Sequence, residues 1–350
     1  MRRARTIGMA LLAVLLLGGC ARAELLPPAT EQARDIHELY NVLLVCATVV
    51  FVLVEGAILF AVFRYRRRDD QLPPQFHGNN LLEVAWTVGP FLLVAVLFGL
   101  GWFTLDRVQA RADNPRVVLN VVGFQWQWRF TYQGEKVQVE KGKPPEDLSI
   151  KGTGAKPAEI YLPVNVPIEV TTEAEDVIHS FYVREFLFKK DAFPGHLNTF
   201  PLTITKPGVY HGQCTEYCGL GHQGMRFTVH AVPMSEYRAW LAQAKKRAAS
   251  GCPADTSPGQ LAADNTSFDK DCMTAPAGKG WTLTFDNKEP VQHNVAIFQG
   301  SNAQGPNVFR GQLVTGPQVV KEQVPALKAG TYFFHCDVHP AAMQGKLVAK

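Results

Sequence analysis

Two short segments of the 350-residue chain concentrate side chains that bind metal ions. The first reads Cys214-x3-Cys218-x3-His222-x2-Met225, and His179 precedes its first cysteine by 35 residues. Two thiolates at this spacing can bridge two metal ions, each of which completes its shell with an imidazole and a weaker ligand. Soft sulfur favours Cu(I) and imidazole accommodates Cu(II). The segment therefore predicts a two-copper centre that shares one electron.

The second segment carries a different ligand set. It reads Cys336-x2-His339-x3-Met343, and His293 lies upstream of it. One thiolate, two imidazoles and a weak axial thioether form the arrangement of blue-copper (type 1) electron-transfer sites. The spacing from the last histidine to the methionine varies among such sites, so Met343 is the ligand that the pattern supports least.

Both segments belong to a longer internal repeat. In each unit a histidine beside apolar residues is followed by a Gly-x-Tyr strand and by a cysteine four residues after the tyrosine. The units are offset by 114 residues at the first histidine, 122 at the cysteine and 118 at the methionine. Four residue types in one order at such similar offsets predict two homologous domains.

Interpretations of these residues that involve no metal remain open. Outside the cytoplasm a pair of cysteines more often forms a disulfide, and Cys214 with Cys218 could do so. A lone histidine or methionine beside a strand is more often a packing residue. The gathering of four ligand types within a dozen residues, matched by an upstream histidine, favours copper.

The elements that must position these ligands are short β-strands. Apolar runs alternate with turn residues after residue 115, at residues 117–122, 159–164, 168–172, 227–232, 281–285, 295–298 and 346–349. This texture is typical of all-β sandwiches or barrels. Between the two β regions we expect an amphipathic helix over residues 235–248 and a Gly, Pro and Ser-rich linker over residues 250–262.

Two apolar segments nearer the N-terminus predict a transmembrane hairpin over residues 35–110. Residues 42–63 are long enough to cross a hydrocarbon core of ~30 Å at ~1.5 Å per residue. Four arginines between residues 64 and 68 place the end of this segment in the cytoplasm by the positive-inside rule. The second segment then returns outward, with helices expected at about residues 40–64 and 81–105.

Each predicted span carries one carboxylate. Glu55 lies in the middle of the first, and Glu83 lies near the cytoplasmic end of the second. Carboxylates in lipid are costly and usually face protein or water. We expect Glu55 to be a protonated or paired helix-contact residue, and we expect the hairpin to pack against a larger membrane partner.

The N-terminus has the features of an export signal. A basic start and a short apolar run over residues 1–19 end at Leu17-Gly18-Gly19-Cys20. This resembles a bacterial lipoprotein signal, in which Cys20 becomes the acylated N-terminus; an uncleaved signal anchor is the alternative. The protein is therefore expected in the bacterial inner membrane, with its β domains on the periplasmic side.

The overall composition excludes several classes of protein. With 47% hydrophobic and 19% charged residues, the chain is too apolar to be disordered. The net charge of +4 falls to +1 when the signal's three arginines are removed, and no long basic block indicates nucleic acid.

Several stretches resemble cytochrome c oxidase subunit II and its binuclear copper centre, CuA. The resemblance covers about residues 35 to 245. The stretches are Leu82-Glu83-Val84-Ala85-Trp86-Thr87, Gly123-Phe124-Gln125-Trp126-Gln127-Trp128, His179-Ser180-Phe181, Asp191-Ala192-Phe193-Pro194-Gly195 and Gly212-Gln213-Cys214-Thr215-Glu216-Tyr217-Cys218-Gly219.

The resemblance implies a complete set of CuA ligands. In the family the two cysteines bridge the ions, the first histidine and the methionine complete one ion, and the second histidine and a backbone carbonyl complete the other. In this chain the implied ligands are His179, Cys214, the carbonyl of Glu216, Cys218, His222 and Met225.

Three further residues match functional positions of the family. The side chain of Glu216 matches a ligand of a magnesium ion at the border with the catalytic subunit. Trp126 matches the aromatic residue through which electrons enter. Glu83 matches the carboxylate at the cytoplasmic mouth of a proton channel, and a simple helix-end carboxylate is the alternative.

The sequence departs from the plain family pattern after about residue 250. No Cys-x-x-Cys-His motif for covalent haem occurs, and residues 263–350 resemble a plastocyanin-like cupredoxin. We expect Cys252 and Cys272 to form a disulfide in an oxidising compartment. Cys46, inside a membrane span, is expected to be a small apolar filler. The CuA domain, with its C-terminal helix, is expected over residues 115–249.

These expectations define the electron-input subunit of a membrane cytochrome c oxidase. Electrons from cytochrome c or a small copper protein would pass through CuA to the haem of subunit I, where oxygen is reduced to water and protons are pumped. The fused domain would be a relay or a docking module within the complex of oxidase subunits.

Two other functions remain open. A CuA-type nitric oxide reductase subunit would differ in its partner, which this chain does not contain. A copper-carrying lipoprotein without electron transfer would not need Trp126 or Glu83.

Overall fold

The computed structural model describes residues 27–66, 78–139, 144–152, 156–249, 252, 257–264, 266–340 and 342–350. The predicted signal with Cys20 and residues 250, 251 and 253–256 of the predicted linker lie outside these residues. The chain divides into two compact units, Met1–Gln109 and Ala110–Lys350. We describe each unit by itself.

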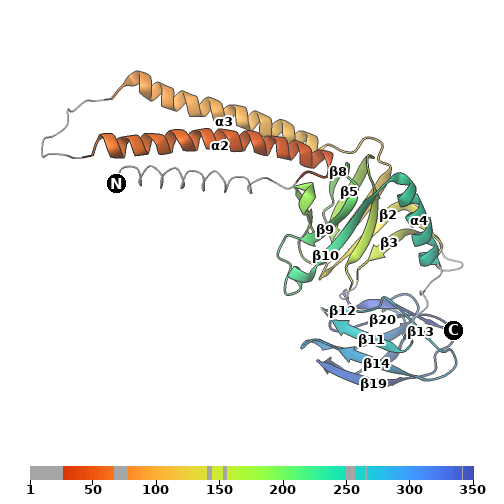
Figure 1. Ribbon diagram of the computed structural model, residues 1–350. Helices are drawn as coiled ribbons and strands as arrows, with labels where there is room; N and C mark the ends of the chain where they lie inside the picture. Colours follow the sequence, from red (N-terminus) through yellow and green to blue (C-terminus); the bar gives the residue numbers. More distant parts are fainter. Residues whose placement is uncertain are drawn as a thin grey trace, which may run out of the picture. The chain divides into compact units, whose positions relative to one another are not determined.

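The first unit is a helical hairpin. Helices α2 (Glu31–Arg64) and α3 (Asn80–Gln109) lie side by side (Figure 1). Their most apolar windows have mean hydropathies of 2.7 and 2.1, and both helices are long enough to cross a membrane. Pro90 lies within α3, which continues past it.

Helix α2 begins nine residues before the expected start near residue 40. The Thr30 side chain accepts a hydrogen bond from the backbone N–H of Ala33 at 2.9 Å, and Glu31 lies in the first turn. This N-cap satisfies a backbone donor that would otherwise have no partner, so the helix extends beyond its apolar part. The hydrophobic segment alone did not reveal this polar extension.

The first β domain is a sandwich of two five-stranded sheets (Figure 1). One sheet has the order β3-β2-β1-β5-β8, and the other has the order β4-β10-β9-β6-β7. The strands are β1 (Val117–Phe124), β2 (Gln127–Val137), β3 (Glu146–Lys151), β4 (Ala158–Pro163), β5 (Ile168–Ala174), β6 (His179–Val183), β7 (Lys189–Ala192), β8 (Asn198–Leu202), β9 (Gly208–Cys214) and β10 (Arg226–Val232). Two 3-10 turns, η1 (Arg184–Phe186) and η2 (His222–Gly224), and helix α4 (Met234–Ala249) complete the domain.

Aromatic side chains fill the space between these sheets. Phe227 stacks on Phe181 at 4.9 Å between ring centroids, and it also lies 5.6 Å from Trp128 and 5.2 Å from Phe130. All four side chains are buried. Burial of such large apolar rings is the main stabilising contribution to a small sandwich. This core lies directly beneath the first candidate metal site, because the Trp128 ring is 6.2 Å from the ring of His179.

The second β domain has two sheets of four and five strands and a separate pair. Their orders are β12-β11-β14-β19, β13-β21-β20-β16-β17 and β15-β18. The strands are β11 (Gln260–Asp264), β12 (Ser267–Phe268), β13 (Cys272–Ala275), β14 (Trp281–Asn287), β15 (Gln292–His293), β16 (Ala296–Gln299), β17 (Asn307–Arg310), β18 (Val314–Thr315), β19 (Gln318–Val324), β20 (Gly330–His335) and β21 (Gln344–Ala349).

The internal repeat of the sequence corresponds to a repeat of topology. The loop with the first cysteine pair joins the antiparallel strands β9 and β10, and the loop with Cys336 joins the antiparallel strands β20 and β21. In each domain a third strand, β6 or β16, pairs with the strand that leads into the loop. The expected all-β, cupredoxin-like fold after a two-helix hairpin is therefore confirmed.

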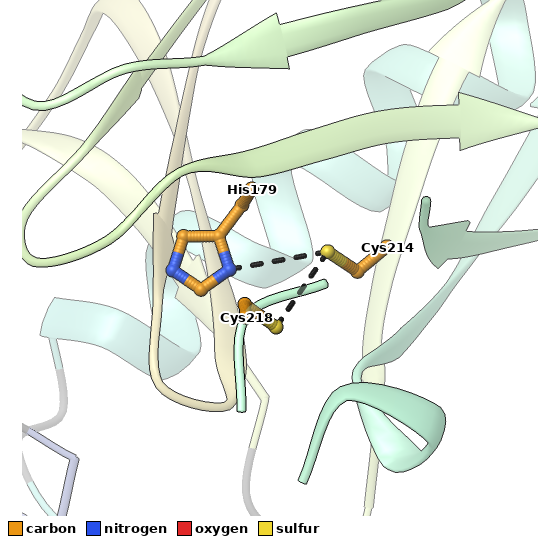
Figure 2. Close-up of side chains that lie close together, drawn as sticks. All are labelled: His179, Cys214 and Cys218. Atoms are coloured by element: carbon orange, nitrogen blue, oxygen red, sulfur yellow. Dashed lines mark hydrogen bonds between the residues drawn. The ribbon is translucent and has the colours of Figure 1, made fainter. Parts of the chain in front are cut away.

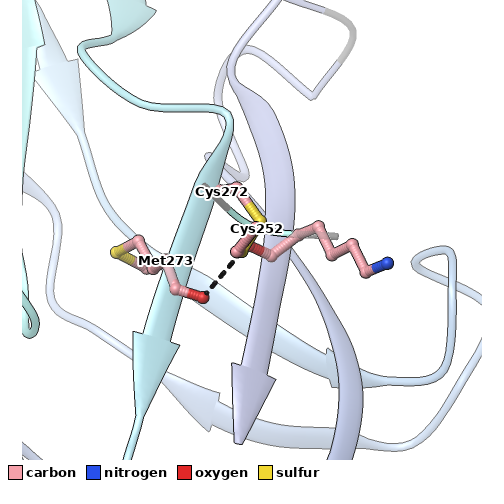
Figure 3. Close-up of a disulfide and its surroundings, with 4 residues drawn as sticks. Cys252, Cys272 and Met273 are labelled. Carbon is pink, nitrogen blue, oxygen red and sulfur yellow. Dashed lines mark hydrogen bonds between the residues drawn. A yellow bond between two sulfur atoms is a disulfide. The ribbon is translucent and has the colours of Figure 1, made fainter. Parts of the chain in front are cut away.

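The structure shortens the expected linker at both ends. Residues 260–262, which we expected in the linker, belong to β11, which pairs in parallel with β14. Cys252 forms a disulfide with Cys272 at the start of β13, and its Sγ lies 3.2 Å from the carbonyl oxygen of Met273 (Figure 3). The chain is therefore covalently tied to the second domain three residues after α4 ends at Ala249.

Candidate metal centres

Three of the predicted CuA ligands meet in the first β domain. His179 begins β6, Cys214 ends β9, and Cys218 lies in the following loop; all three side chains are buried. In Figure 2, dashed lines join the Cys214 sulfur to the His179 ring and to the Cys218 sulfur. The Sγ atom of Cys214 is 3.9 Å from His179 Nδ1 and 3.8 Å from Cys218 Sγ. Neither cysteine is in a disulfide, which the sequence alone left open.

The remaining predicted ligands surround Cys218 and Cys214. His222 Nδ1 is 3.5 Å and Met225 Sδ is 3.9 Å from Cys218 Sγ. The backbone carbonyl oxygen of Glu216 is 3.2 Å from Cys214 Sγ. Two thiols, two imidazoles, a thioether and a carbonyl thus converge from two strands and one loop. This set of soft and borderline donors, with two sulfurs close enough to be shared, fits a pair of copper ions.

A partly buried hydrogen bond fixes the orientation of His179. Its Nε2 is 2.8 Å from Asp176 Oδ1, which leaves Nδ1 directed at Cys214. Asp176 also accepts backbone hydrogen bonds from Gln125 and Val177, each at 2.7 Å. Carboxylate partners of this kind hold a metal-binding histidine in one tautomer and one ring orientation.

The His179 ring also rests against Gly123. A Cβ atom at residue 123 would lie 2.9 Å from His179 Cβ and 3.0 Å from ring atoms of His179. A larger residue at this position would therefore push the imidazole away from the sulfurs. The glycine is required here for close approach rather than for backbone conformation.

The pKa values near this site follow from its burial and hydrogen bonds. Burial opposes ionisation of Asp176, but the hydrogen bonds from His179 and the backbone lower its pKa. Burial likewise opposes protonation of His179, and Asp176 outweighs it and raises the His179 pKa. The Cys214–Cys218 hydrogen bond lowers the pKa of Cys214 to about 3 and raises the pKa of Cys218. One of the two thiols therefore ionises much more readily than the other.

Trp126 lies over the loop that carries Cys218. Its indole Nε1 donates a hydrogen bond to the Cys218 carbonyl at 2.9 Å, and the side chain of Gln125 donates to the same oxygen at 2.8 Å. The ring packs so closely on the loop that a Cβ atom at Gly221 would lie 2.5 Å from it. Trp126 is thus joined to a predicted copper ligand through a single hydrogen bond and a carbonyl group.

Glu216 makes different contacts through its carbonyl oxygen, which lies 3.2 Å from Cys214 Sγ, and through its side chain. The carboxylate forms an ion pair with Lys189, which also contacts Asp191 at 3.2 Å. The pair is partly exposed, and the interaction raises the pKa of Lys189. The two halves of Glu216 are therefore available for different roles.

The second β domain brings together three of its four predicted ligands through their metal-binding atoms. His293 Nδ1 is 3.7 Å from Cys336 Sγ and 3.2 Å from His339 Nδ1. His293 and Cys336 are buried, and His339 is half-buried. Burial lowers the pKa of both histidines, which favours the neutral imidazole that binds metal. One thiol and two imidazoles in this arrangement fit a single copper ion.

Met343 is placed by the backbone of the same loop. Its N–H donates to the His339 carbonyl and its carbonyl accepts from the Cys336 N–H, both at 2.9 Å. The side chain is fully buried. The loop is also held by Asn294, whose Oδ1 accepts from the Asp337 N–H at 2.9 Å. The fourth predicted ligand therefore lies in the loop that carries two of the others.

Sequence analysis did not identify the carboxylates that orient the first histidine of each site. Glu289 Oε1 is 2.9 Å from His293 Nε2, and Asp176 Oδ1 is 2.8 Å from His179 Nε2. A signal was present, because a carboxylate precedes each first histidine by three or four residues in both repeats. Gln125 and Asn294, which also hold the loops, carried no comparable signal.

The predicted membrane carboxylates lie in the first unit. Glu83 is exposed in the first turn of α3, and its carbonyl accepts a hydrogen bond from Thr87 at 2.8 Å. Glu55 lines an apolar cavity between α2 and α3, together with Cys46. Neither carboxylate has an ion-pair partner among the described residues.

Three regions of the chain match family models. Residues 21–105 match the transmembrane domain of cytochrome c oxidase subunit II, and residues 117–232 match its periplasmic domain. Residues 236–349 match a cupredoxin-like domain. The two apolar helices and the transmembrane match together indicate an inner-membrane protein with a periplasmic part.

Similar proteins are named as subunits of cytochrome c oxidase. Cytochrome c oxidase subunit 2 of Cereibacter sphaeroides is 33% identical over 242 residues, which cover 63% of this chain and 79% of the relative. A probable cytochrome c oxidase subunit 2 of Rickettsia bellii is 30% identical over 234 residues, which cover 64% and 85%. Proteins with these names are parts of an oxidoreductase complex.

Two solved structures resemble separate parts of the chain. The periplasmic domain of cytochrome oxidase subunit II from Bradyrhizobium japonicum is 28% identical, with a TM-score of 0.34, and the match covers 39% of this chain and 97% of that one. Auracyanin A, a blue copper protein of Chloroflexus aurantiacus, is 28% identical, with a TM-score of 0.24, and the match covers 26% and 96%. With its membrane and periplasmic family domains and an added C-terminal cupredoxin-like domain, the chain belongs to the cytochrome c oxidase subunit II family.

Proposed function

We propose that this chain is the electron-input subunit of a proton-pumping cytochrome c oxidase. It takes electrons from cytochrome c or a small copper protein and passes them to the haem of subunit I, where oxygen is reduced to water. The convergence of His179, Cys214 and Cys218 in a buried site of a subunit II chain is the observation that carries this proposal.

The proposal assigns two copper sites to the β domains. The ligands of the binuclear CuA centre are His179, Cys214, the carbonyl of Glu216, Cys218, His222 and Met225. Those of the type 1 site are His293, Cys336, His339 and Met343. Copper supplies one-electron transfer in both sites, and the rigid strands and loops keep the donor atoms in place through the change of oxidation state.

Trp126 is the proposed point at which electrons enter the CuA centre. Its indole is hydrogen-bonded to the carbonyl of Cys218, so a donor that contacts the indole is separated from a copper ligand by one hydrogen bond and a short covalent path. The alternative role of Trp126 is packing over Gly219 and Gly221. A Trp126→Phe variant keeps the ring but removes the hydrogen bond, and it separates these roles.

Glu216 is proposed as a magnesium ligand at the border with subunit I. Its carboxylate is partly exposed and held by Lys189, whereas its carbonyl faces the cysteines. Carboxylate oxygen is a suitable ligand for this hard cation. One residue would then connect the two metal centres through its own backbone.

Glu83 is proposed as the proton-channel carboxylate. It occupies the N-terminal turn of α3, where the helix dipole stabilises a carboxylate, and the arginines after α2 place this end of the hairpin in the cytoplasm. Protons taken up here would reach the oxygen site through the partner subunit. The proposed acylation of Cys20 would add an anchor at the opposite, periplasmic face.

The fused cupredoxin domain is proposed as a tethered relay between the external donor and CuA. The Cys252–Cys272 disulfide attaches this domain three residues after the end of α4, a span of at most about 11 Å. A tether this short holds a donor at an effective concentration of roughly millimolar or more. The relay would gain this effective concentration from the tether alone, without an additional binding surface.

Turnover of the assembled oxidase with cytochrome c tests these roles. Cys214→Ser should abolish turnover, and Cys336→Ser should lower turnover with the physiological donor. Cys46→Ser serves as the control, because Cys46 is a free cysteine outside both sites. Unchanged turnover of Cys214→Ser would contradict electron input through CuA, whereas unchanged turnover of Cys336→Ser with every soluble donor would contradict only the relay.

A further inference from the structure

A groove between the two membrane helices lies outside every role described above. It occupies the periplasmic ends of α2 and α3, has a volume of about 300 Å³ and is open to the surroundings of the hairpin. Its walls change from apolar to charged along the helices. This gradient is the feature that indicates its occupant.

Helix α2 contributes one wall of the groove. Asp35, Glu38, Leu39 and Val42 line it. Residues three, four and seven positions apart share one face of a helix, so these side chains form a single stripe. The stripe is acidic at its outer end and apolar toward the membrane, over a rise of about 10 Å.

Helix α3 contributes the opposite wall with the same spacing. Leu100, Phe103, Thr104 and Arg107 line it, and Phe103 is 66% exposed. Leu100 and Phe103 continue the apolar part. The Thr104 hydroxyl and the Arg107 guanidinium lie on the side of the groove nearer the end of the helix.

The charged rim of the groove has no partner within the described chain. Asp35, Glu38 and Arg107 take part in none of the ion pairs of the described residues. Arg107 lies in the last turn of α3, where the helix dipole favours a cation, whereas Asp35 and Glu38 lie beyond the first turn of α2. Two carboxylates and one guanidinium give the rim a net charge of −1.

We infer that this groove binds one phosphatidylethanolamine molecule of the outer leaflet. The primary ammonium of the headgroup pairs with Asp35 and Glu38, the phosphate pairs with Arg107, and the acyl chains follow the apolar walls. The interfacial layer of a bilayer is about 5–8 Å thick on each side, somewhat less than the rise of about 10 Å over which the stripe changes from acidic to apolar. The volume suits a headgroup and the first part of its chains.

Charge complementarity distinguishes this lipid from the alternatives. An anionic phospholipid would bring a phosphate without a cation to a rim that is already negative. Phosphatidylcholine has the same net charge, but its quaternary ammonium cannot donate hydrogen bonds to the carboxylates. A primary ammonium makes charge-assisted hydrogen bonds, which are roughly twice as strong as neutral ones.

Native mass spectrometry of the full chain in detergent tests the inference. The chain is titrated separately with palmitoyl-oleoyl phosphatidylethanolamine, phosphatidylglycerol and phosphatidylcholine. We expect one phosphatidylethanolamine molecule to bind at least tenfold more tightly than either other lipid. The double variant Asp35→Asn/Glu38→Gln should lose this preference, and Arg107→Gln should weaken all three lipids.

Two further variants make the result specific. Asp106→Asn removes a carboxylate beside Arg107 that does not line the groove, and it should leave the preference intact. Cys20→Ser removes the proposed acyl anchor and should also change nothing. An increase in lipid binding by Cys20→Ser would show that the protein's own acyl chains fill the groove, and it would overturn the inference.

The assembled oxidase supplies a second readout. Gas-phase ejection of this subunit from the complex should release it with phosphatidylethanolamine bound, and the Asp35→Asn/Glu38→Gln subunit should emerge without it. Equal affinity for phosphatidylglycerol, loss of preference in Asp106→Asn, or ejection of the wild-type subunit without lipid would each overturn the inference. The last result would mean that a partner subunit covers the groove.

Discussion

Lengthening the tether between α4 and the second β domain should slow electron transfer between the two copper sites. The disulfide attaches the domain at Cys252, three residues after Ala249. Inserting eight Gly and Ser residues between Ser250 and Gly251 lengthens this tether to 11 residues and keeps the disulfide. Effective concentration falls roughly as the −3/2 power of tether length, so it should fall about sevenfold.

Removing the disulfide should have the same kinetic effect by a different route. In a Cys252→Ser/Cys272→Ser variant, the first attachment of the domain moves to Gln260, where β11 begins, which is 11 residues after Ala249. This variant also loses the stabilisation of a 20-residue loop, about 3 kcal/mol. Agreement between the two variants would assign the slowing to tether length and not to stability.

The assay is rapid reduction of the type 1 copper in the copper-loaded full chain. Reoxidation of this copper by the CuA centre is followed at the blue absorption band, and a rate independent of protein concentration identifies transfer within one chain. The same eight residues added after Lys350 serve as the control and should leave the rate unchanged. An unchanged rate in both tether variants would refute the reasoning, because transfer would not depend on a mobile tethered domain.

Three other predictions concern the sites and the core. Asp176→Asn should lower the copper affinity of the first site, and Glu289→Gln should lower the copper affinity of the second, each by roughly 10–100-fold in chelator competition. The spectrum of the other site should stay unchanged in each variant and serves as the internal control. Equal effects of one variant on both sites would contradict the assignment. Gly123→Ala should displace His179, cost about 1–3 kcal/mol in denaturant unfolding and alter the CuA spectrum, whereas a change in stability alone would argue against contact with the ligand. Burial raises the pKa of Tyr132, so the stabilising contribution of this residue is present below pH 10 and is lost above it. Above pH 10 the free energy of unfolding of the wild type should fall more steeply than that of Tyr132→Phe, by up to about 1.4 kcal/mol per pH unit. Parallel slopes would exclude Tyr132 as the source of this pH dependence.

Residue spacing predicted which candidate ligand side chains the fold brings together, for a physical reason. A loop between two antiparallel strands keeps residues such as Cys214, Cys218 and Met225 close together in space whenever they are close in sequence. Identification of the upstream histidines, His179 and His293, depended on the internal repeat, because only their matching positions in the two units linked them to the loops. Short apolar runs between turn residues located seven of the strands, because strands bury apolar side chains in a sandwich.

The features that sequence did not predict depend on single contacts. Asp176 and Glu289 are ordinary acidic residues until the fold places them on a histidine. The extension of α2 depends on the Thr30 cap, which hydropathy does not measure. The linker is shortened by the predicted Cys252–Cys272 disulfide and by the parallel pairing of β11 with β14, and only this second, long-range feature was not predicted.

Copper content and the EPR spectrum of the purified copper-loaded full chain test the central claim most directly. The account predicts three copper ions per chain, with one unpaired electron shared by two copper nuclei and a separate type 1 signal. The shared signal should disappear in Cys218→Ser and the type 1 signal in Cys336→Ser. One copper ion or none per wild-type chain, or two independent mononuclear signals in place of the shared one, would contradict the account.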